Sequence, residues 1–143
     1  MSDEARQTLP SPRQQFETHV SAATHTLPHP QRGEIWDVNW SPGRGAEQQG
    51  IRPALIIQND RGNASSSYPL TIVASMSRTE RDVPLHVRIA PNDENGLTHS
   101  TDVKCEQVMT IEKSRLMRRR GRISPDELRQ VDMALKLSFN LVN

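Results

Sequence analysis

The sequence has little of what many enzyme and membrane-protein classes require. Its single cysteine, Cys105, cannot form an internal disulfide, which agrees with a reducing compartment, and its strand-like setting predicts a small buried side chain. No apolar run reaches the roughly 18 residues that cross a bilayer, and the N-terminus lacks the apolar core of a signal peptide. We therefore expect a cytoplasmic protein with no membrane partner.

Motifs for common cofactors are also missing. The chain has no glycine-rich phosphate loop, no nucleophile elbow, and no histidine pair with a carboxylate at metal-ligand spacing. Three of the five histidines fall within the first 29 residues, which leaves few metal ligands elsewhere. Aromatic residues make up only 3% of the chain, so base stacking cannot be the main source of nucleic-acid affinity. Any catalysis is expected to proceed without metal, nucleotide or flavin.

The length and composition predict one domain preceded by an arm. A chain of 143 residues can bury one core but is short for two domains. Its hydrophobic fraction of 34% is low, and the deficit is concentrated in residues 1–29, which are rich in Pro, Gln, Thr, Ser and His. Such a segment buries too little apolar surface to offset its ordering entropy. We expect a disordered arm over 1–29 and a single domain over 30–143.

Short alternating segments indicate a mainly β domain. The segment "GEIWDVNW" (33–40) alternates in this way, and Trp36 and Trp40 fall on one side of it, as expected for core residues. Further strands are expected at 52–58, 68–77, 84–90, 101–111 and 114–123. The polar segment 59–67 indicates a turn and loop. Five or six short strands followed by one helix predict a small, curled antiparallel barrel.

The C-terminal segment carries the signals of a helix. Ser124 as N-cap, Pro125 at the first position and Glu127 at the third form a capping box. An apolar stripe at helical spacing then continues to the end of the segment: Leu128, Val131, Leu135, Phe139 and Val142. We therefore expect a helix over 124–142 that packs one face on the sheet.

Charge and loop length point to a site for a polyanion. Segment 103–122 holds seven basic and two acidic residues, so 7 − 2 gives a local charge of +5. The loop 41–50 is long for a hairpin connection, and it places Glu47 shortly before Arg52 at the start of an apolar strand. Cleavage of RNA through the ribose 2′-hydroxyl needs a base, an acid and a cation for the phosphorane, and no metal. An arginine meets the cationic requirement because its planar fork grips two phosphoryl oxygens.

Four segments together carry a resemblance to a known family. They are "RGEIWDVNW" (32–40), "GAEQQGIRPALIIQND" (45–60), "TIVASMSR" (71–78) and "VKCEQVMTIEKSRL" (103–116). In order and spacing the chain resembles the MazF/PemK toxin endoribonucleases over about residues 30–142. The resemblance implies an SH3-like barrel with a C-terminal helix and a homodimer. It also implies metal-independent, sequence-specific cutting of single-stranded RNA to 2′,3′-cyclic phosphate and 5′-hydroxyl ends, and inhibition by a MazE-like antitoxin with an acidic segment.

The resemblance also assigns roles to particular residues. Arg52 matches the family's catalytic arginine. Ser77 falls where the family often has threonine at the end of the third strand, and it keeps the hydroxyl donor and acceptor. Glu47 matches an acidic loop position proposed to assist proton transfer in some members. The residues expected to contact RNA are Gln48, His86, Gln107, Arg118, Arg119 and Arg120.

Each of these residues also has a plainer interpretation. Glu47 and Arg52 alone could form an exposed ion pair of little energetic value. Ser77 could be an ordinary strand-terminal serine, and His86, which faces away from the apolar side of its strand, an exposed histidine without a task. The arginine run could be a solvated edge that deters aggregation.

Two other functions compete with the nuclease. The related CcdB toxins share the barrel and dimer plan but poison DNA gyrase by protein contact, which requires neither Arg52 nor Ser77. The mostly apolar "SFNLVN" terminus lacks the polar or aromatic end expected of such a poison. A barrel that binds RNA without cutting it is the remaining alternative.

Overall fold

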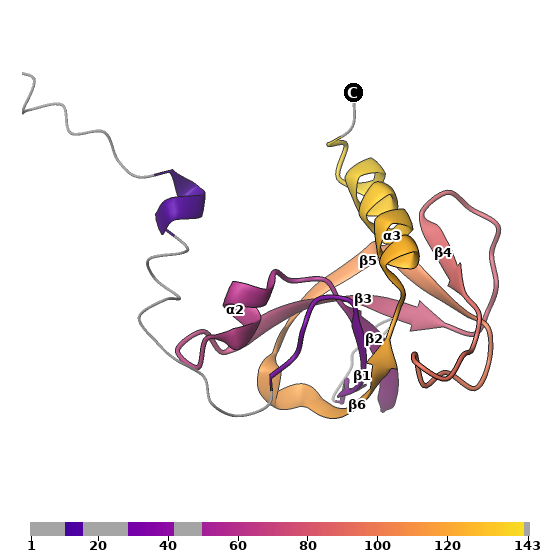
Figure 1. Cartoon of the computed structure of the whole chain (residues 1–143), viewed down its shortest axis with the longest axis horizontal. Helices are drawn as coiled ribbons and strands as arrows, with labels where there is room; N and C mark the ends of the chain where they lie inside the picture. The colour runs from indigo at the N-terminus through magenta and orange to yellow at the C-terminus, as the bar shows by residue number, and fades with distance from the viewer. Residues whose placement is uncertain (1–10, 16–28, 42–49, 142–143) are drawn as a thin grey trace, which may run out of the picture.

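Six antiparallel strands and a C-terminal helix form the domain (Figure 1). The computed structural model describes residues 11–15, 29–41 and 50–141. The elements of the domain are β1 (Glu34–Asn39), β2 (Ile51–Ile56), α2 (Asp60–Ala64), β3 (Leu70–Ser77), β4 (His86–Ile89), β5 (Thr101–Glu112), the 3₁₀ turn η2 (Lys113–Arg115), β6 (Leu116–Arg122) and α3 (Pro125–Ser138). The expected mainly β class with a closing helix is confirmed. No helix in the described ranges is long and apolar enough to cross a membrane.

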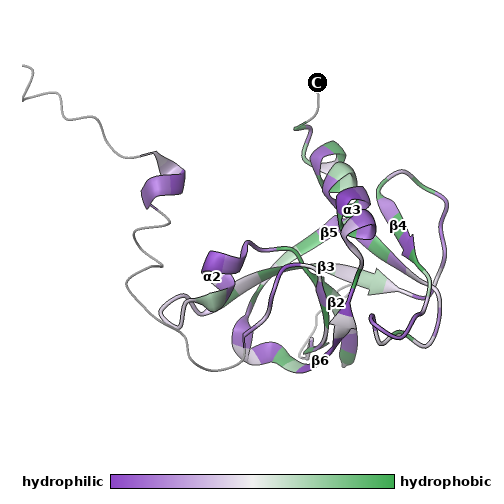
Figure 2. Cartoon of the chain, in the orientation of Figure 1, coloured by the Kyte–Doolittle hydropathy of each residue, from purple (hydrophilic) through white to green (hydrophobic). Residues whose placement is uncertain are grey.

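The strand order β4-β5-β3-β2-β1-β6 produces a curled sheet with a hydrophobic cluster on each face. One cluster packs between the sheet and α3, and β1 contributes Ile35 to it. The other includes Val38 from the same strand and Trp40 just after its end, with Trp36 packed against it. Since both faces of β1 are covered, the expected core role of the two tryptophans is confirmed. Figure 2 shows hydrophobic and hydrophilic residues together on α3, as expected for a helix with one buried face.

A β-bulge in β5 bends the sheet. The register with β3 runs from Leu70 opposite Glu112 to Ala74 opposite Val108, and then shifts so that Ser75 lies opposite Lys104. The shift takes residues 105–107 out of the ladder with β3. A bulge of this kind increases local twist and redirects side chains. The bulge therefore determines the direction in which the side chains of residues 105–107 point.

The interpretation of 59–67 as turn and loop was wrong in part, because its first half forms α2. Asn59 caps this helix by accepting a hydrogen bond from the Gly62 N–H at 2.9 Å. The buried Asn63 side chain accepts from Thr71 at 2.7 Å and from Gln58 at 3.0 Å. A five-residue helix is too short to show helical periodicity, and its polar residues resemble those of turns.

Helix α3 begins as expected but ends earlier. The Ser124 hydroxyl accepts from the Glu127 N–H at 3.1 Å, and the Glu127 carboxylate accepts from the Ser124 N–H at 2.9 Å. The helix ends at Ser138, and Asn140 follows with φ of 57° in the left-handed region. The Leu141 N–H then bonds to the Lys136 carbonyl, as in a Schellman cap.

The end of the predicted apolar stripe therefore needs correction. Val131 and Leu135 are buried as expected, whereas Phe139 caps the helix and is 54% exposed. Val142 lies outside the described residues. The stripe that packs on the sheet is thus one turn shorter than the sequence pattern indicated.

Cys105 is fully buried in the cluster beneath α3, so its predicted role as a small hydrophobic side chain is confirmed. Burial, together with the nearby carboxylates of Glu106 and Asp132, raises the pKa of the thiol to about 12. The reactive thiolate is therefore scarce at neutral pH.

The capping box gives a stability prediction. Ser124→Ala removes the hydroxyl that satisfies the Glu127 N–H, so we expect a loss of about 1 kcal/mol in the free energy of unfolding. Chemical denaturation measures it. Ser138→Ala, near the other end of α3, is the control and should change stability less. Equal effects of the two substitutions would contradict the capping role.

Candidate active site

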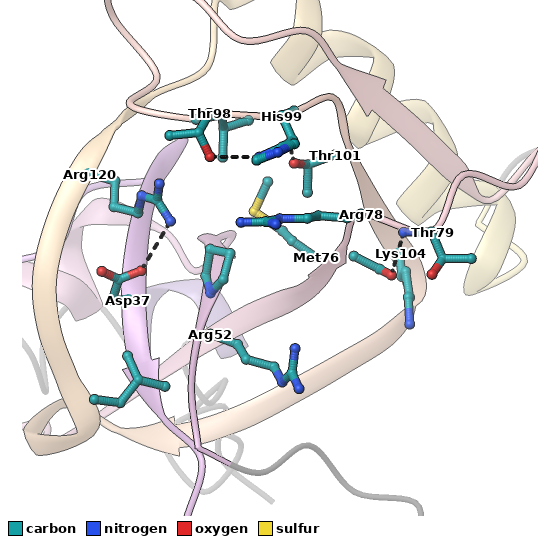
Figure 3. A pocket seen from close by; sticks show the side chains of 14 residues that line it. Asp37, Arg52, Met76, Arg78, Thr79, Thr98, His99, Thr101, Lys104 and Arg120 are labelled. Atoms are coloured by element: carbon teal, nitrogen blue, oxygen red, sulfur yellow. Dashed lines mark hydrogen bonds and ion pairs between the residues drawn. The ribbon is translucent and has the colours of Figure 1, made fainter.

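A cavity of about 880 Å³ opens where β2, β3 and β5 end near one another (Figure 3). It brings together residues from β1, β2, β3, β5, β6 and the loops after β3 and before β5. Its lining comprises Asp37, Ile51, Arg52, Pro53, Met76, Ser77, Arg78, Thr79, Leu97, Thr98, His99, Thr101, Lys104 and Arg120. The cavity is thus assembled from segments that are far apart in the sequence.

Arg52 and Ser77 both line this cavity. They lie on strands that pair with each other, and the ladder between those strands ends with Ala54 opposite Ser75. Arg52 and Ser77 are each two residues beyond that pair, so their side chains project from the same face as the pair, on adjoining strands. Arg52 is exposed and Ser77 is half-buried. The cavity is therefore lined by both the Arg52 guanidinium and the Ser77 hydroxyl.

The residues after Ser77 turn back toward it. The Ser77 hydroxyl oxygen accepts a hydrogen bond from the Thr79 N–H at 3.1 Å. This turn places Arg78 and Thr79 in the lining, and Figure 3 shows the Arg78 side chain extending into the middle of the cavity. The hydroxyl proton of Ser77 is not used in this bond, so it is available to a ligand.

The charge of the lining is strongly positive. Four cationic side chains, Arg52, Arg78, Lys104 and Arg120, line the cavity with one carboxylate, Asp37. Asp37 lies 3.5 Å from Arg120 and 3.4 Å from Arg118, so its charge is compensated by two guanidinium groups. The surplus of positive charge suits a phosphodiester.

A second cavity of about 440 Å³ continues from the first. The two share Ser77, Thr79 and Lys104, and the second adds His86 and Gln107. Its remaining lining residues are Arg81, Val83 and Glu106. A long ligand that occupies the first cavity would therefore find a polar continuation along β5.

The interpretation of His86 as an exposed side chain was wrong. Its side chain is only 7% exposed and lies between two carboxylates, with Nδ1 3.3 Å from Asp102 and Nε2 2.9 Å from Glu106. Asp102 is fully buried, and its carboxylate also accepts bonds from the Arg81 N–H at 2.8 Å and from Arg88 Nε at 3.0 Å. His86 thus belongs to a buried polar network at the wall of the second cavity.

The network sets the charge state of Asp102. Burial alone would raise the pKa of this carboxyl, but the hydrogen bonds from the Arg81 N–H, Arg88 and His86 together lower the pKa below its ordinary value. The carboxylate is accordingly held in its charged form inside the protein. The hydrogen bonds that Arg88 donates to Asp102 and Asp82 raise the pKa of its guanidinium.

Comparison with known proteins identifies the family. The model of the PemK-like, MazF-like toxin of type II toxin–antitoxin systems matches residues 31–139, which is most of the chain. The chain belongs to this family. It is 38% identical over 114 residues to Endoribonuclease MazF9 of Mycobacterium tuberculosis, covering 77% of this chain and 96% of that protein.

Solved structures support the same fold. An endoribonuclease from a mycobacterial species, solved in complex with its cognate antitoxin, matches with a TM-score of 0.66 and 23% identity, over 80% of this chain and 98% of that one. MazF from Deinococcus radiodurans matches with a TM-score of 0.67 and 23% identity, over 80% and 99% of the two chains. The barrel-type fold expected for a MazF/PemK protein is thus confirmed.

The basic segment 103–122 is divided among several tasks in this member of the family. Lys104 and Arg120 line the first cavity. Arg119 pairs with the buried Glu34, and Arg115 donates to the carbonyls of Asn39 and Ser41. Lys113 donates to the Gly62 and Ser65 carbonyls, and its burial lowers its pKa. The local charge of +5 is therefore not a single patch.

The remaining expected site residues lie in different places. Arg118 is on the same strand as Arg120, outside the lining of both cavities, and its side chain is 71% exposed. Arg119 is also outside both linings. Glu47 and Gln48 lie outside the described residues. Contact of any of them with RNA stays a prediction.

The cavity also contains residues that sequence reasoning did not single out. Arg78 directly follows Ser77, and that adjacency was a signal available in the sequence. Lys104 was counted in the basic segment 103–122 but was not assigned to the site, and His99 had no signal, because both reach the cavity through strand pairing and loop folding. The His99 ring is held by a 2.8 Å contact between Nδ1 and the Thr98 hydroxyl. Within the described ranges, no cluster of three or more His, Cys, Asp or Glu side chains is arranged to hold a metal ion.

The lowered pKa of Asp102 predicts a pH dependence of stability. A carboxyl with a depressed folded-state pKa stabilises the fold above its unfolded value, near 3.8, and that contribution is lost as pH falls through the folded value. At pH 7, Asp102→Asn should lower the free energy of unfolding by about 2 kcal/mol. Denaturation across the acid range should show that the difference in free energy of unfolding between the variant and wild type narrows below about pH 4. A difference that does not depend on pH would contradict the stabilising role of the Asp102 charge.

Proposed function

We propose that this protein is the toxin component of a type II toxin–antitoxin system, a sequence-specific endoribonuclease that cuts single-stranded messenger RNA in the cytoplasm and so inhibits translation. Family membership and 38% identity to a protein named an endoribonuclease support this activity. The observation that carries the proposal is the cavity in which Arg52 and Ser77 lie with three further cationic side chains. Such a site suits a substrate whose reacting group is an anionic phosphodiester.

The proposed reaction is attack of a ribose 2′-hydroxyl on the adjacent phosphorus. A base removes the 2′ proton, the 5′-oxygen leaves with a proton from an acid, and the products carry 2′,3′-cyclic phosphate and 5′-hydroxyl ends. DNA is spared because it has no 2′-hydroxyl. The four cationic side chains supply positive charge for the five-coordinate phosphorane, so the reaction is proposed to need no metal.

A distinct role is proposed for each side chain, from the geometry for the residues that line the cavity and from the family resemblance for Glu47. The Arg52 fork binds two phosphoryl oxygens and stabilises the phosphorane. Ser77 holds the scissile phosphate through its hydroxyl proton, since its oxygen already accepts from Thr79. Arg78, in the middle of the cavity, adds a second guanidinium. Glu47, from the loop before β2, is the candidate base.

The second cavity is proposed to hold RNA next to the scissile phosphate. Gln107 is exposed in its lining and offers both a donor and an acceptor, and His86 forms part of the wall. Side chains of this kind read base edges in single-stranded RNA, which is where sequence recognition takes place. Arg120 extends the positive surface on the other side, within the first cavity.

A MazE-like antitoxin is the proposed protein partner. A relative with the same fold was solved with its cognate antitoxin. The surplus positive charge of the cavity complements an acidic, partly disordered segment. Such a segment would compete directly with the RNA backbone for Arg52 and the neighbouring cations.

A homodimer is the proposed assembly. Met133 and Leu137 on α3 are 58% and 49% exposed, and both line a groove of about 670 Å³ between α3 and β4. Val87 and Ala134 lie at the base of the same groove. Large apolar side chains gathered on one face are typical of a subunit interface. A second copy that presents the same face would bury them.

The nuclease proposal is tested with Arg52→Ala. Purified protein is incubated with a long single-stranded RNA and matching DNA in excess EDTA, and the cut ends are mapped. Wild type should cut only RNA and leave cyclic phosphates, and the variant should lose at least about 100-fold in rate because phosphorane stabilisation is removed. Arg61→Ala, exposed on α2 outside the cavity, should cut like wild type.

Other outcomes would favour the competing functions. RNA that stays intact across many sequences would overturn the nuclease. Tight RNA binding without product would then indicate a passive RNA-binding barrel, and inhibition of gyrase supercoiling would indicate a CcdB-like poison.

The proposed interface is tested with Met133→Asp and Leu137→Asp. Each substitution places a charge in an apolar contact, so both should shift the protein from dimer to monomer in sedimentation-velocity experiments. Lys136→Asp, exposed on the same helix but outside the groove lining, is the control and should stay dimeric. A wild-type monomer at high concentration would refute the dimer.

A further inference from the structure

The segment that joins β3 to β4 has to cross β5 near the first residues of that strand. The two strands flank β5, and both Ser77 of β3 and Arg88 of β4 lie opposite Asp102 of β5. Residues 78–84 of this crossing are all exposed. Burial of apolar side chains therefore contributes little to holding them in place.

The crossing nevertheless carries much of the polar surface at the candidate site. Arg78 and Thr79 line the first cavity, and Thr79 and Arg81 line the second. The Arg78 guanidinium reaches the cavity beside Ser77 only if the crossing keeps its conformation. Displacement of a positioned group by about 1 Å can cost on the order of 100-fold in rate.

Asp102 makes the contacts that hold the middle of the crossing. Its buried carboxylate accepts the Arg81 backbone N–H at 2.8 Å, which is a direct bond from β5 to the crossing. The same carboxylate accepts from Arg88, whose guanidinium continues to Asp82 at 2.9 Å and lies 3.8 Å from Glu80. One buried anion thus links β5 to three successive residues of the crossing, directly or through Arg88.

At the far end of the crossing, the Cys105 N–H of β5 donates to the Leu85 carbonyl at 2.9 Å. Before that residue, the other hydrogen bonds found among the described residues of the crossing are local. Thr79 N–H donates to the Ser77 hydroxyl, and Val83 N–H donates to the Arg81 carbonyl. Such bonds shape turns but do not fix their position relative to the sheet. Because charged hydrogen bonds inside a protein are stronger than neutral ones, the Asp102 contacts are well suited to that task.

We propose that Asp102 is a positioning residue for RNA cleavage: its buried carboxylate fixes the crossing of residues 78–85, so that Arg78 and Thr79 stand beside Ser77. The proposal rests on the nuclease function proposed above and adds a residue that does not touch RNA. Asp102 acts through the Arg81 backbone and through Arg88. Its loss should therefore resemble the loss of Arg78 at the active site.

Asp102→Asn is the decisive variant because it keeps the shape and removes the charge. One carboxylate oxygen becomes an NH₂ group, which would face a second donor, either the Arg81 N–H or Arg88 Nε. Asp82→Asn is the matched control, since it makes the same chemical change on a partner of Arg88 that is 92% exposed. An exposed ion pair of that kind contributes little.

Two measurements are made on each full-length variant, well below its melting temperature. In Asp102→Asn, hydrogen–deuterium exchange of the amides of residues 79–83 should become faster while β1 and β2 stay protected. The kcat for cleavage of a single-site RNA should fall by about 10- to 100-fold. Asp82→Asn should match wild type in both.

A double-mutant cycle with Arg78→Ala separates positioning from general loss of structure. If Asp102 acts through Arg78, adding Arg78→Ala to Asp102→Asn should lower kcat little further than either substitution alone. Additive losses would overturn the proposal, as would unchanged exchange at 79–83 in Asp102→Asn.

Two further results keep the test decisive. If Asp102→Asn does not fold, Arg88→Gln serves in its place, because it removes the partly exposed guanidinium that connects the Asp102 carboxylate to both Glu80 and Asp82. It should raise exchange in the same amides, and unchanged exchange there would refute the proposal. If wild type cuts no RNA, the nuclease function fails and Asp102 loses its role in cleavage. The exchange data would then report only whether Asp102 holds the crossing.

Discussion

The pairing of β5 with β3 on one edge and β4 on the other is the constraint on which the candidate site depends. It places Ser77 and Arg88 opposite the same residue, Asp102, and forces residues 78–85 across the end of β5. Polar surface that serves the cavity is thereby carried on a segment with little apolar packing. Hydrogen bonds from this segment and from Arg88 to a buried carboxylate can hold the segment in place where apolar packing does not.

Positive charge is used in two ways in this protein. Some cations stabilise the fold: Arg115 donates hydrogen bonds to backbone carbonyls, and Arg119 neutralises the buried Glu34. Others line the cavity: Arg52, Arg78 and Lys104, together with Arg120, which also pairs with Asp37 and donates to the Gly96 carbonyl. A count of charges along the sequence cannot separate these uses, because both require the same residue types. What distinguishes them is the acceptor that each side chain reaches after folding.

Much of the fold was predictable because its signals are local. Alternation and short apolar runs located the six strands, and the Ser124 capping box located the start of α3. The prediction failed where local signals were weak or misleading. Helix α2 is too short to show a period, and α3 stops at a left-handed Asn140 although apolar residues continue beyond it. His86 alternates like an exposed residue, yet Asp102 and Glu106 enclose it from the neighbouring strand.

The sequence by itself determined the family and the mainly β class, and it pointed to Arg52 and Ser77 as candidate site residues that the structure places in one cavity, because each of these is encoded in short segments with fixed spacing. Only the tertiary structure decided which side chains join them. Lys104 and Arg120 belong to the basic segment that the sequence indicated, but which of its seven cations line the cavity follows from strand order and register. Such long-range placement arises from cooperative packing of the whole sheet, so no local pattern records it.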